Sequence, residues 1–194
     1  MAQGILLTDD EIVALAAMLG RPWPIGLATA APTAGELTRA GARGVRSLVI
    51  RGIVTVGADS GYTPHPGIAA IVETFIRAPR RVGAYIAPAA AVDTMAGASI
   101  TAVPVAGIWW VDSATAQGIH GFRQADRDEV VGAIADLADQ TCDGTLLAGV
   151  DDPSAYVCVV VHGDDSAKRT VVTNDSAGAG SRESLSEALD EAVA

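Results

Sequence analysis

The feature of this sequence that most constrains its fold is a change of hydrophobic period near residue 80. Before that point, apolar residues recur every three or four positions, which is the spacing of amphipathic helices. After it, short runs such as 82–86 and 156–161 have the alternation and β-branched content of strands. Helices and strands that are segregated along a chain favour an α+β fold over an alternating α/β fold.

Local signals place three helices in the first part of the chain. Thr8 with Glu11 and Thr33 with Glu36 match the capping box that begins a helix. In this motif, each of the two side chains accepts a hydrogen bond from the backbone N–H of the other residue. Pro66 suits the first turn of a third helix. The predicted helices cover about 9–19, about 33–51 and about 67–77.

The second part of the chain predicts an antiparallel β-sheet of about six strands. Four strands separated by short turns suggest a meander, a helix over 126–139 follows it, and a β-hairpin closes the sheet. We therefore expect a single α+β domain over 1–180 and an acidic C-terminal tail helix over 181–194. Within that domain, 7–139 holds the helical segment, the meander and the closing helix, and 155–174 holds the hairpin.

Composition limits the classes of function. The net charge of −10 argues against a nucleic-acid-binding protein, which normally carries a basic surface. The uncharged stretch 94–111 contains Gly, Pro, Ser and Thr, so two buried strands are a better interpretation than a membrane span. The N-terminus has no basic segment before an apolar run, and two cysteines suit a reducing compartment. We therefore expect a cytoplasmic protein without a membrane span.

No catalytic motif is found in the sequence. The three histidines are far apart, and none lies in a His-x-x-x-His or His-Glu-x-x-His pattern. Neither Cys142 nor Cys158 has a metal-binding spacing, and Ser60 and Ser166 do not lie in a nucleophile elbow. We therefore predict a protein that is not an enzyme and that needs no metal and no cofactor.

One alternative is a small-ligand-binding domain or enzyme with a site around Asp112, His120 and Arg123. Asp112 and His120 are predicted on neighbouring strands and could face each other across a hairpin. Arg123 follows on the strand of His120, so a ligand pocket could form where the three side chains converge. The simpler interpretation of the same residues is an ion pair at the edge of the sheet.

Trp109 and Trp110 are the most distinctive candidates for a partner-binding surface. Successive side chains of a strand point to opposite faces of the sheet, so one Trp is expected in the core and the other on the far face. If helices cover only one face, the second Trp is an apolar surface that favours a partner. Tyr156, the hairpin 156–173 and the loop 87–97 are further candidates for this surface.

The helix 33–51 has two faces with different predicted roles. Gly41 and Gly44 lower helix propensity, so we expect them to permit close packing against a neighbouring element. Arg39, Arg43 and Arg46 lie on the opposite face. They form either a solvated stripe or a second partner-binding surface.

The order of elements resembles a known family. Residues 7 to about 138 are similar to the EspG family of ESX (type VII) secretion-associated proteins of actinobacteria. The shared features are the opening helix, a Pro-containing link, a helix running into Arg51-Gly52-Ile53-Val54, a helix between Pro66 and Pro79, a β-meander and a closing helix. The resemblance implies an α+β fold with a central antiparallel sheet and helical subdomains.

The resemblance also implies a function. Family members are non-enzymatic cytosolic chaperones that bind PE–PPE-type secretion substrates and shield the apolar helical tip of the PPE partner. They are longer than this chain and contain two pseudo-symmetric halves, whereas this chain has one half, a hairpin and a short helix. It is therefore either a reduced relative or a homodimer in which a second copy supplies the other half; a purely structural homodimer is a further alternative.

Overall fold

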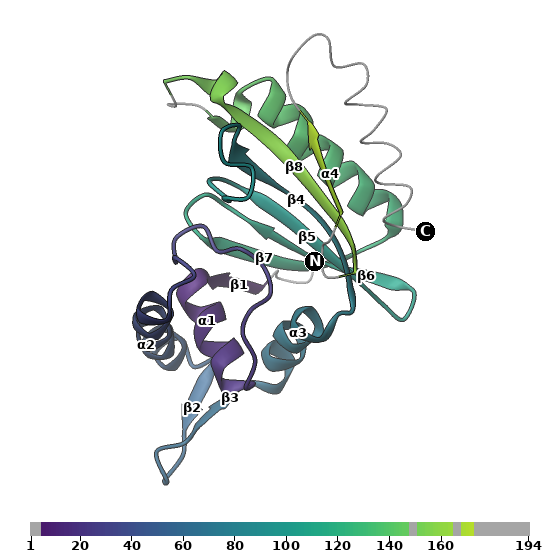
Figure 1. Cartoon of the computed structure of the whole chain (residues 1–194). Helices are drawn as coiled ribbons and strands as arrows, with labels where there is room; N and C mark the ends of the chain where they lie inside the picture. The colour runs from purple at the N-terminus through teal and green to yellow at the C-terminus, as the bar shows by residue number, and fades with distance from the viewer. Residues whose placement is uncertain (1–4, 148–150, 165–167, 173–194) are drawn as a thin grey trace.

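A seven-stranded antiparallel sheet forms the centre of this computed structural model, which describes residues 5–147, 151–164 and 168–172. Its strand order is β1-β7-β6-β5-β4-β8-β9 (Figure 1). The strands of the sheet are β1 (Ile5–Thr8), β4 (Arg80–Pro88), β5 (Ser99–Val105), β6 (Ile108–Ala114), β7 (Ile119–Ala125), β8 (Tyr156–Asp164) and β9 (Lys168–Val172). The predicted α+β fold is confirmed, with one strand more than expected because β1 pairs with β7.

The helices begin where their capping residues predict. They are α1 (Asp9–Met18), α2 (Ala34–Ile50), α3 (Pro66–Arg77) and α4 (Arg127–Cys142), with 3-10 turns at Thr145–Leu147 and Pro153–Ala155. The capping box of Thr8 and Glu11 forms in full. Thr33 accepts the N–H of Glu36, but the Glu36 carboxylate binds Arg39 and Arg43 instead of returning to Thr33. The second capping box is therefore only half formed.

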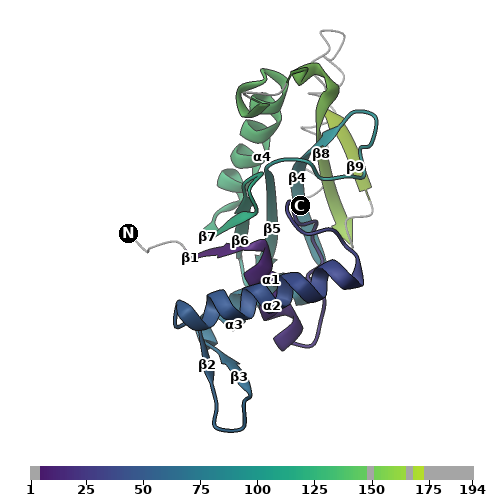
Figure 2. The same ribbon diagram turned by 90° about the vertical axis from the view of Figure 1, so that its left-hand side faces the viewer.

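Helices cover both faces of the sheet. On one face, α4 packs on β4, β5, β6 and β8, where Val82 and Val111 meet Ile134 and Leu137 (Figure 1). On the other face, α1 and α3 pack over β1, β5 and β7, and α2 packs on α1 (Figure 2). Phe75 of α3 is fully buried there. Burying one such side chain stabilises a fold by roughly 1.5–3 kcal/mol.

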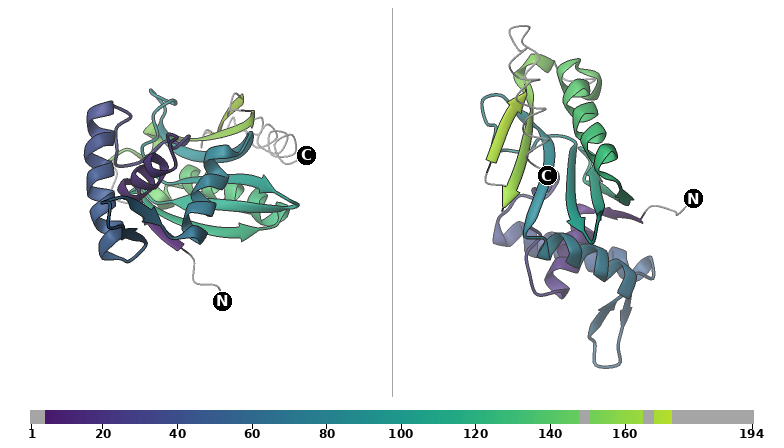
Figure 3. Two further views of the ribbon diagram at one scale, coloured as in Figure 1. Left: turned by 90° about the horizontal axis from the view of Figure 1, so that it is seen from below. Right: turned by 90° about the vertical axis from the view of Figure 1, so that its right-hand side faces the viewer.

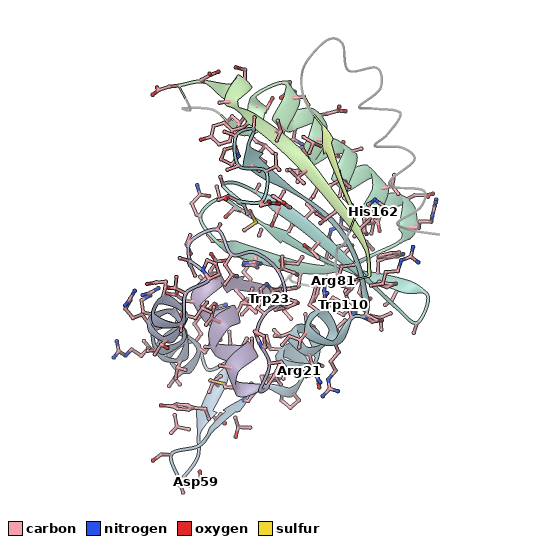
Figure 4. All side chains as sticks on the ribbon, viewed as in Figure 1. Arg21, Trp23, Asp59, Arg81, Trp110 and His162 are labelled. Atoms are coloured by element: carbon pink, nitrogen blue, oxygen red, sulfur yellow. The ribbon has the colours of Figure 1, made fainter. Side chains whose placement is uncertain are left out.

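A two-stranded ribbon projects from the helical side of the molecule. It consists of β2 (Val54–Val56) and β3 (Tyr62–Pro64), and its tip carries Asp59 (Figures 3 and 4). The sequence predicts an extended segment at residue 54 but a loop over 57–66, so the second strand of the ribbon is a correction. The turn includes Ser60 in a left-handed conformation, and Gly57 and Gly61 are joined by a backbone hydrogen bond.

The meander and the hairpin of the sequence prediction are both present. Strands β4 to β7 pair in chain order, and β8 pairs with both β4 and β9. The predicted tail helix over 181–194 lies outside the described residues, and the single domain over 1–180 stays a prediction. The stretch 94–111 contains β5 and part of β6. Of the helices that the structure describes, none combines the length and apolarity needed to cross a membrane.

Candidate functional site

The most concentrated group of buried charges joins helix α1 to the β6–β7 hairpin. His120 Nδ1 lies 2.8 Å from Asp112 Oδ2, and His120 Nε2 lies 2.7 Å from Asp9 Oδ1. Thr29 adds two hydrogen bonds to Asp9 Oδ2, from its backbone N–H at 2.6 Å and its hydroxyl at 2.7 Å. His120 is 1% exposed, and both carboxylates are buried with it. We call Asp9, His120 and Asp112 the acid–histidine cluster.

The antiparallel register explains why Asp112 and His120 meet. Asp112 pairs with Phe122 and Ala114 pairs with His120, so the two polar side chains are diagonal neighbours on one face. Asp9 arrives from the first turn of α1, where the helix dipole favours a carboxylate. The sequence shows no sign of this contact, because Asp9 and His120 lie 111 positions apart.

The electrostatics of the cluster favour a protonated histidine. Burial opposes the imidazolium charge, but hydrogen bonds and charges from Asp112 and Asp9 raise the pKa of His120 to about 9. Burial would raise the pKa of Asp9, yet the hydrogen bonds from His120 and Thr29 lower it overall. Asp112 has fewer such bonds, so burial raises its pKa. At neutral pH, both ring N–H groups therefore donate to carboxylates.

Two aromatic rings pack against the imidazole of the cluster. Phe122 stacks on it with a centroid distance of 6.2 Å, and Trp23 meets it edge-on with a centroid distance of 6.4 Å. Neither of the two cavities described below is lined by a residue of the cluster. Because both ring nitrogens are occupied and the ring is buried, the arrangement suits a structural connection better than a proton-transferring site.

The predicted trio of Asp112, His120 and Arg123 does not converge. Arg123 lies on the face of the sheet that α4 covers, with its side chain 45% exposed and its Nη1 3.9 Å from Glu129. Asp112 and His120 do meet, but they do so in the interior and not as an ion pair at the edge of the sheet. The difference arises because β1 pairs with β7, so His120 is not on an edge strand.

A third buried carboxylate, that of Glu11, joins α1 to α2. Glu11 is fully buried, and its Oε2 accepts hydrogen bonds from the Thr8 backbone N–H at 2.9 Å and from Arg51 Nη1 at 2.6 Å. Its Oε1 accepts the Ser47 hydroxyl at 2.7 Å. Glu11, which completes the cap of α1, thus also anchors α2. The sequence pattern predicts the cap and carries no sign of the second role.

Neither tryptophan of the predicted partner surface forms a large uncovered patch. Trp109 is partly buried in the core beneath α4, and Trp110 is partly buried in the core beneath α1 and α3. They do point to opposite faces, as the strand geometry predicts. However, helices cover both faces, so the condition for an exposed Trp is not met. Tyr156 is also partly buried, on the α4 side.

The arginine face of α2 is largely engaged within the chain. Arg39 pairs with Glu36 at 2.7 Å, and Arg43 pairs with both Asp10 at 2.6 Å and Glu36 at 3.0 Å. Arg46 is exposed. The carboxylates raise the pKa of the Arg43 guanidinium above its ordinary value through direct hydrogen bonds. Two of the three predicted partner-binding arginines thus hold α2 to itself and to α1.

A cavity of about 470 Å³ opens on the face of the sheet that carries Asp112 and His120. Its walls include the segment 24–26, which follows α1, and Asp93 and Met95 of the predicted loop 87–97; Met95 packs against Gly26. Its floor is formed by β4 and β5. The residues of the floor and of the adjacent β8 are Arg81, Val82, Gly83, Ala84, Tyr85, Ser99, Ile100, Thr101 and Val161.

Three polar side chains of this cavity are nearly buried: Arg81 at 8%, Ser99 at 6% and Thr101 at 8% exposed. Arg81 Nη2 donates to the Phe75 carbonyl at 3.1 Å, which ties the guanidinium to the end of α3 (Figure 4). The hydroxyls of Ser99 and Thr101 form no side-chain hydrogen bond with any residue in the described ranges. No pattern in the sequence marks these three residues, because only the sheet order brings β4 and β5 under the segment 24–26.

A second cavity, of about 420 Å³, lies between α1, α2 and the segment 20–27. Its lining is mainly apolar and includes Val13, Ala16, Leu27 and Leu37. Trp23 borders it, and the buried Nε1 of that ring has no hydrogen-bond partner among the residues that the structure describes.

The described residues hold no cluster of three His, Cys, Asp or Glu side chains that could bind a metal ion. Cys142 and Cys158 are both free thiols, and burial raises the pKa of the Cys158 thiol to about 12. Cys158 therefore behaves as a small apolar residue of the α4-side core. In comparisons with known proteins, no protein-family model and no curated protein matches this sequence.

Proposed function

We propose that this chain is a non-enzymatic binding protein that holds a protein client, in the manner of the cytosolic chaperones for PE–PPE-type secretion substrates that its sequence resembles. The observation that supports this proposal is an apolar part of the sheet, next to the larger cavity, on which none of the described helices packs. We call this surface, formed by Tyr85, Val92, Val161 and Val171, the open face.

The open face follows from the register of β4, β8 and β9. Tyr85 pairs with Val159, and Val159 pairs with Val171, so all three side chains lie on the face opposite α4. Tyr85, Val92 and Val161 are partly buried around a small core of their own, and Val171 is 39% exposed. On this side of the sheet, the described helices α1 and α3 pack mainly on β1 and β5 rather than on β8 (Figures 1 and 2).

An apolar client surface is a good chemical match for the open face. Protein interfaces bury an apolar centre inside a polar rim, and Asp93 and the exposed ends of the strands supply polar groups at its border. The enclosed acid–histidine cluster offers no reacting group to a client. The loop 87–97 and the hairpin 156–173, which the sequence predicts as candidates for the partner-binding surface, border the open face.

The decisive experiment is co-expression with a panel of PE–PPE pairs, followed by purification of the complex by size and measurement of stoichiometry. Val171→Arg places a charge in the open face, whereas Ile108→Arg changes an equally exposed side chain, 40% against 39%, at the distant β5–β6 turn. We expect Val171→Arg to weaken client binding by about tenfold or more, because an unpaired charge is costly to bury. Ile108→Arg should bind like the wild type.

Two results would contradict the proposal. One is that no PE–PPE pair of the panel co-purifies with this chain, under conditions in which an authentic EspG-family chaperone retains its own client. The other is equal binding by the two arginine variants. The mass of the purified chain alone separates the homodimer alternative, since a chain that is monomeric in solution cannot supply its own second half.

A further inference from the structure

We propose that the 420 Å³ cavity between α1 and α2 is a binding site for a medium-chain carboxylic acid. The alkyl chain would lie along Val13, Leu27 and Leu37. The carboxylate would bind Arg21 and Trp23. This inference goes beyond the client-binding proposal and does not depend on it. The volume lies within the range of about 300–1,000 Å³ that is typical of small-molecule sites.

The walls of this cavity are mainly apolar. Ala16 is buried in the wall that α1 provides, whereas Val13, Leu27 and Leu37 are only partly buried. These three side chains therefore leave part of their apolar surface against the cavity. An alkyl chain that lies there would remove this surface from water, and the gain is proportional to the apolar area that is buried. The walls thus suit the alkyl part of a ligand.

Arg21 places a positive charge at the border of the cavity. Its side chain is exposed, and it is the only charged residue among the described residues that line the cavity. Within the described ranges, its guanidinium has no ion-pair or hydrogen-bond partner, in contrast to Arg39 and Arg43 of α2. Glu36, which precedes Leu37 in the chain, is bound by those two arginines. The donors of Arg21 can therefore bind a ligand carboxylate.

Trp23 supplies a hydrogen-bond donor on the wall of the same cavity. Its Nε1 is buried, and no residue in the described part of the chain accepts a hydrogen bond from it. Buried N–H groups in proteins are normally hydrogen-bonded, so this indole would gain a partner from a ligand oxygen. Because Nε1 is covered by its surroundings, we expect a small rotation of the indole when the acid binds.

The backbone around Trp23 holds both polar groups beside the cavity (Figure 4). Pro22 and Pro24 flank Trp23, and a proline disfavours the helical conformation of the residue that precedes it. Arg21 and Trp23 are therefore both restricted to extended conformations, and neither belongs to a helix. A site that is arranged in advance loses less conformational entropy when it binds a ligand.

The test uses octanoate as the probe and octylammonium, which has the same alkyl chain, as its counterpart of opposite charge. The net charge of −10 on the protein favours the cation in general, so a preference for the acid must come from a local site. Binding is followed by the NMR signals of the Trp23 indole N–H and the Gly20 amide, with Trp109 and Gly132 on the α4 side as references. We expect saturable shifts at Trp23 and Gly20 with octanoate and no shift at the references. Octylammonium should bind about tenfold more weakly, because Arg21 attracts one probe and repels the other.

Charge reversal connects this preference to Arg21. Arg21→Glu should invert it, so that octylammonium binds more tightly than octanoate by about threefold or more. Arg46→Glu is the matched control, because it makes the same change of net charge at an exposed position of α2 that does not line the cavity. The control should keep the preference of the wild type.

A second variant tests the indole donor. Trp23→Phe removes the N–H and keeps an aromatic ring, so it should weaken octanoate binding by about fivefold, with the Gly20 amide as the reporter. Octylammonium has no acceptor for the indole N–H, so its binding should change little. If Trp23→Phe fails to fold, Arg21→Glu still tests the site, because Arg21 is exposed.

Equal affinities for the two probes, or tighter binding of octylammonium by the wild type, would overturn the proposal. So would an Arg21→Glu protein that still prefers the acid, or an absence of shifts with millimolar octanoate. Shifts of the same size at Trp109 and Gly132 would show general binding to apolar surface and would overturn it as well. Val171→Arg separates the two proposals, since it should impair client binding and leave octanoate binding intact.

Discussion

At the scale of single residues, the acid–histidine cluster shows how one imidazole can join distant parts of a chain. Asp9 begins a helix, Thr29 belongs to the segment after it, and Asp112 and His120 lie on two strands. A buried ion pair is costly to desolvate, and removing one partner leaves an uncompensated charge, which typically costs about 3–5 kcal/mol. The cluster therefore makes the position of α1 depend on the protonation of His120.

Stability should fall on the alkaline side of neutrality. The pKa of His120 rises from 6.5 to about 9 on folding, so its stabilisation is complete below pH 6.5 and lost as pH rises through about 9. By linkage this amounts to about 3 kcal/mol. Urea unfolding between pH 6 and pH 9.5 measures the loss, and His120→Gln should remove most of the pH dependence.

A histidine NMR titration provides the direct check on that prediction. A His120 ring that loses its proton below pH 7 would contradict the account. The opposite shifts of Asp9 and Asp112 partly cancel at acidic pH, so the alkaline side is the informative one.

At the scale of elements, the contact between α1 and α2 depends on one glycine. A Cβ atom at Gly44 would overlap the Asp10 carbonyl and lie 2.9 Å from the Ala14 Cβ. At Gly41, one turn earlier, the nearest atom is Val13 Cγ1 at 3.7 Å, an ordinary contact. The sequence suggests close packing at both glycines, but only Gly44 provides it.

The two glycines form a matched pair for mutation. Gly44→Ala should lower the free energy of unfolding by roughly 1–3 kcal/mol, because the helices must separate. Gly41→Ala should raise it by roughly 0.5–1 kcal/mol through better helix propensity. Urea unfolding of both variants gives the two values, and a Gly44→Ala protein as stable as Gly41→Ala would refute the proposed close approach.

At the scale of the whole molecule, the sheet is shared by two cores. Trp109 lies in the core beneath α4, whereas Trp110 and Trp23 lie in the core beneath α1 and α3. Because each of the strands β5, β6 and β7 contributes side chains to both cores, loss of one core should expose the other side of the same strands. We therefore expect the described fold to unfold as one cooperative unit.

Single-tryptophan proteins test this cooperativity. Trp23→Phe combined with Trp110→Phe leaves Trp109 as the probe of the α4 side, and Trp23→Phe combined with Trp109→Phe leaves Trp110 as the probe of the helical side. Each fluorescence transition in urea should coincide with loss of the circular dichroism signal of the same protein. Separate transitions within one protein would show two independent units and would contradict the single-domain prediction.

Local patterns in the sequence were sufficient for much of the fold. Thr8, Thr33 and Pro66 mark the starts of three helices within one or two residues, since a cap is a contact between neighbours in the chain. The alternation of apolar and polar residues in the second half of the chain located the meander and the hairpin, because this pattern too involves only residues that are close in the sequence. The short turn between their strands made it possible for Asp112 and His120 to face each other across a hairpin.

Long-range pairing decided the rest. The four residues of β1 are too few to show a period, and they become a strand only because β7 offers an unpaired edge. That pairing places His120 in the interior, and Asp9 lies within 2.7 Å of it. Arg123 lies on the other face because it is three positions from His120 along β7 and successive side chains of a strand alternate. The cavity with Arg81, Ser99 and Thr101 likewise needs β4 beside β5 and the segment 24–26 across them. By itself, the sequence determined the helices and the strands of the meander and the hairpin, because capping and periodicity act between near neighbours. The tertiary structure alone decided the sites, because they form from contacts between residues far apart in the chain.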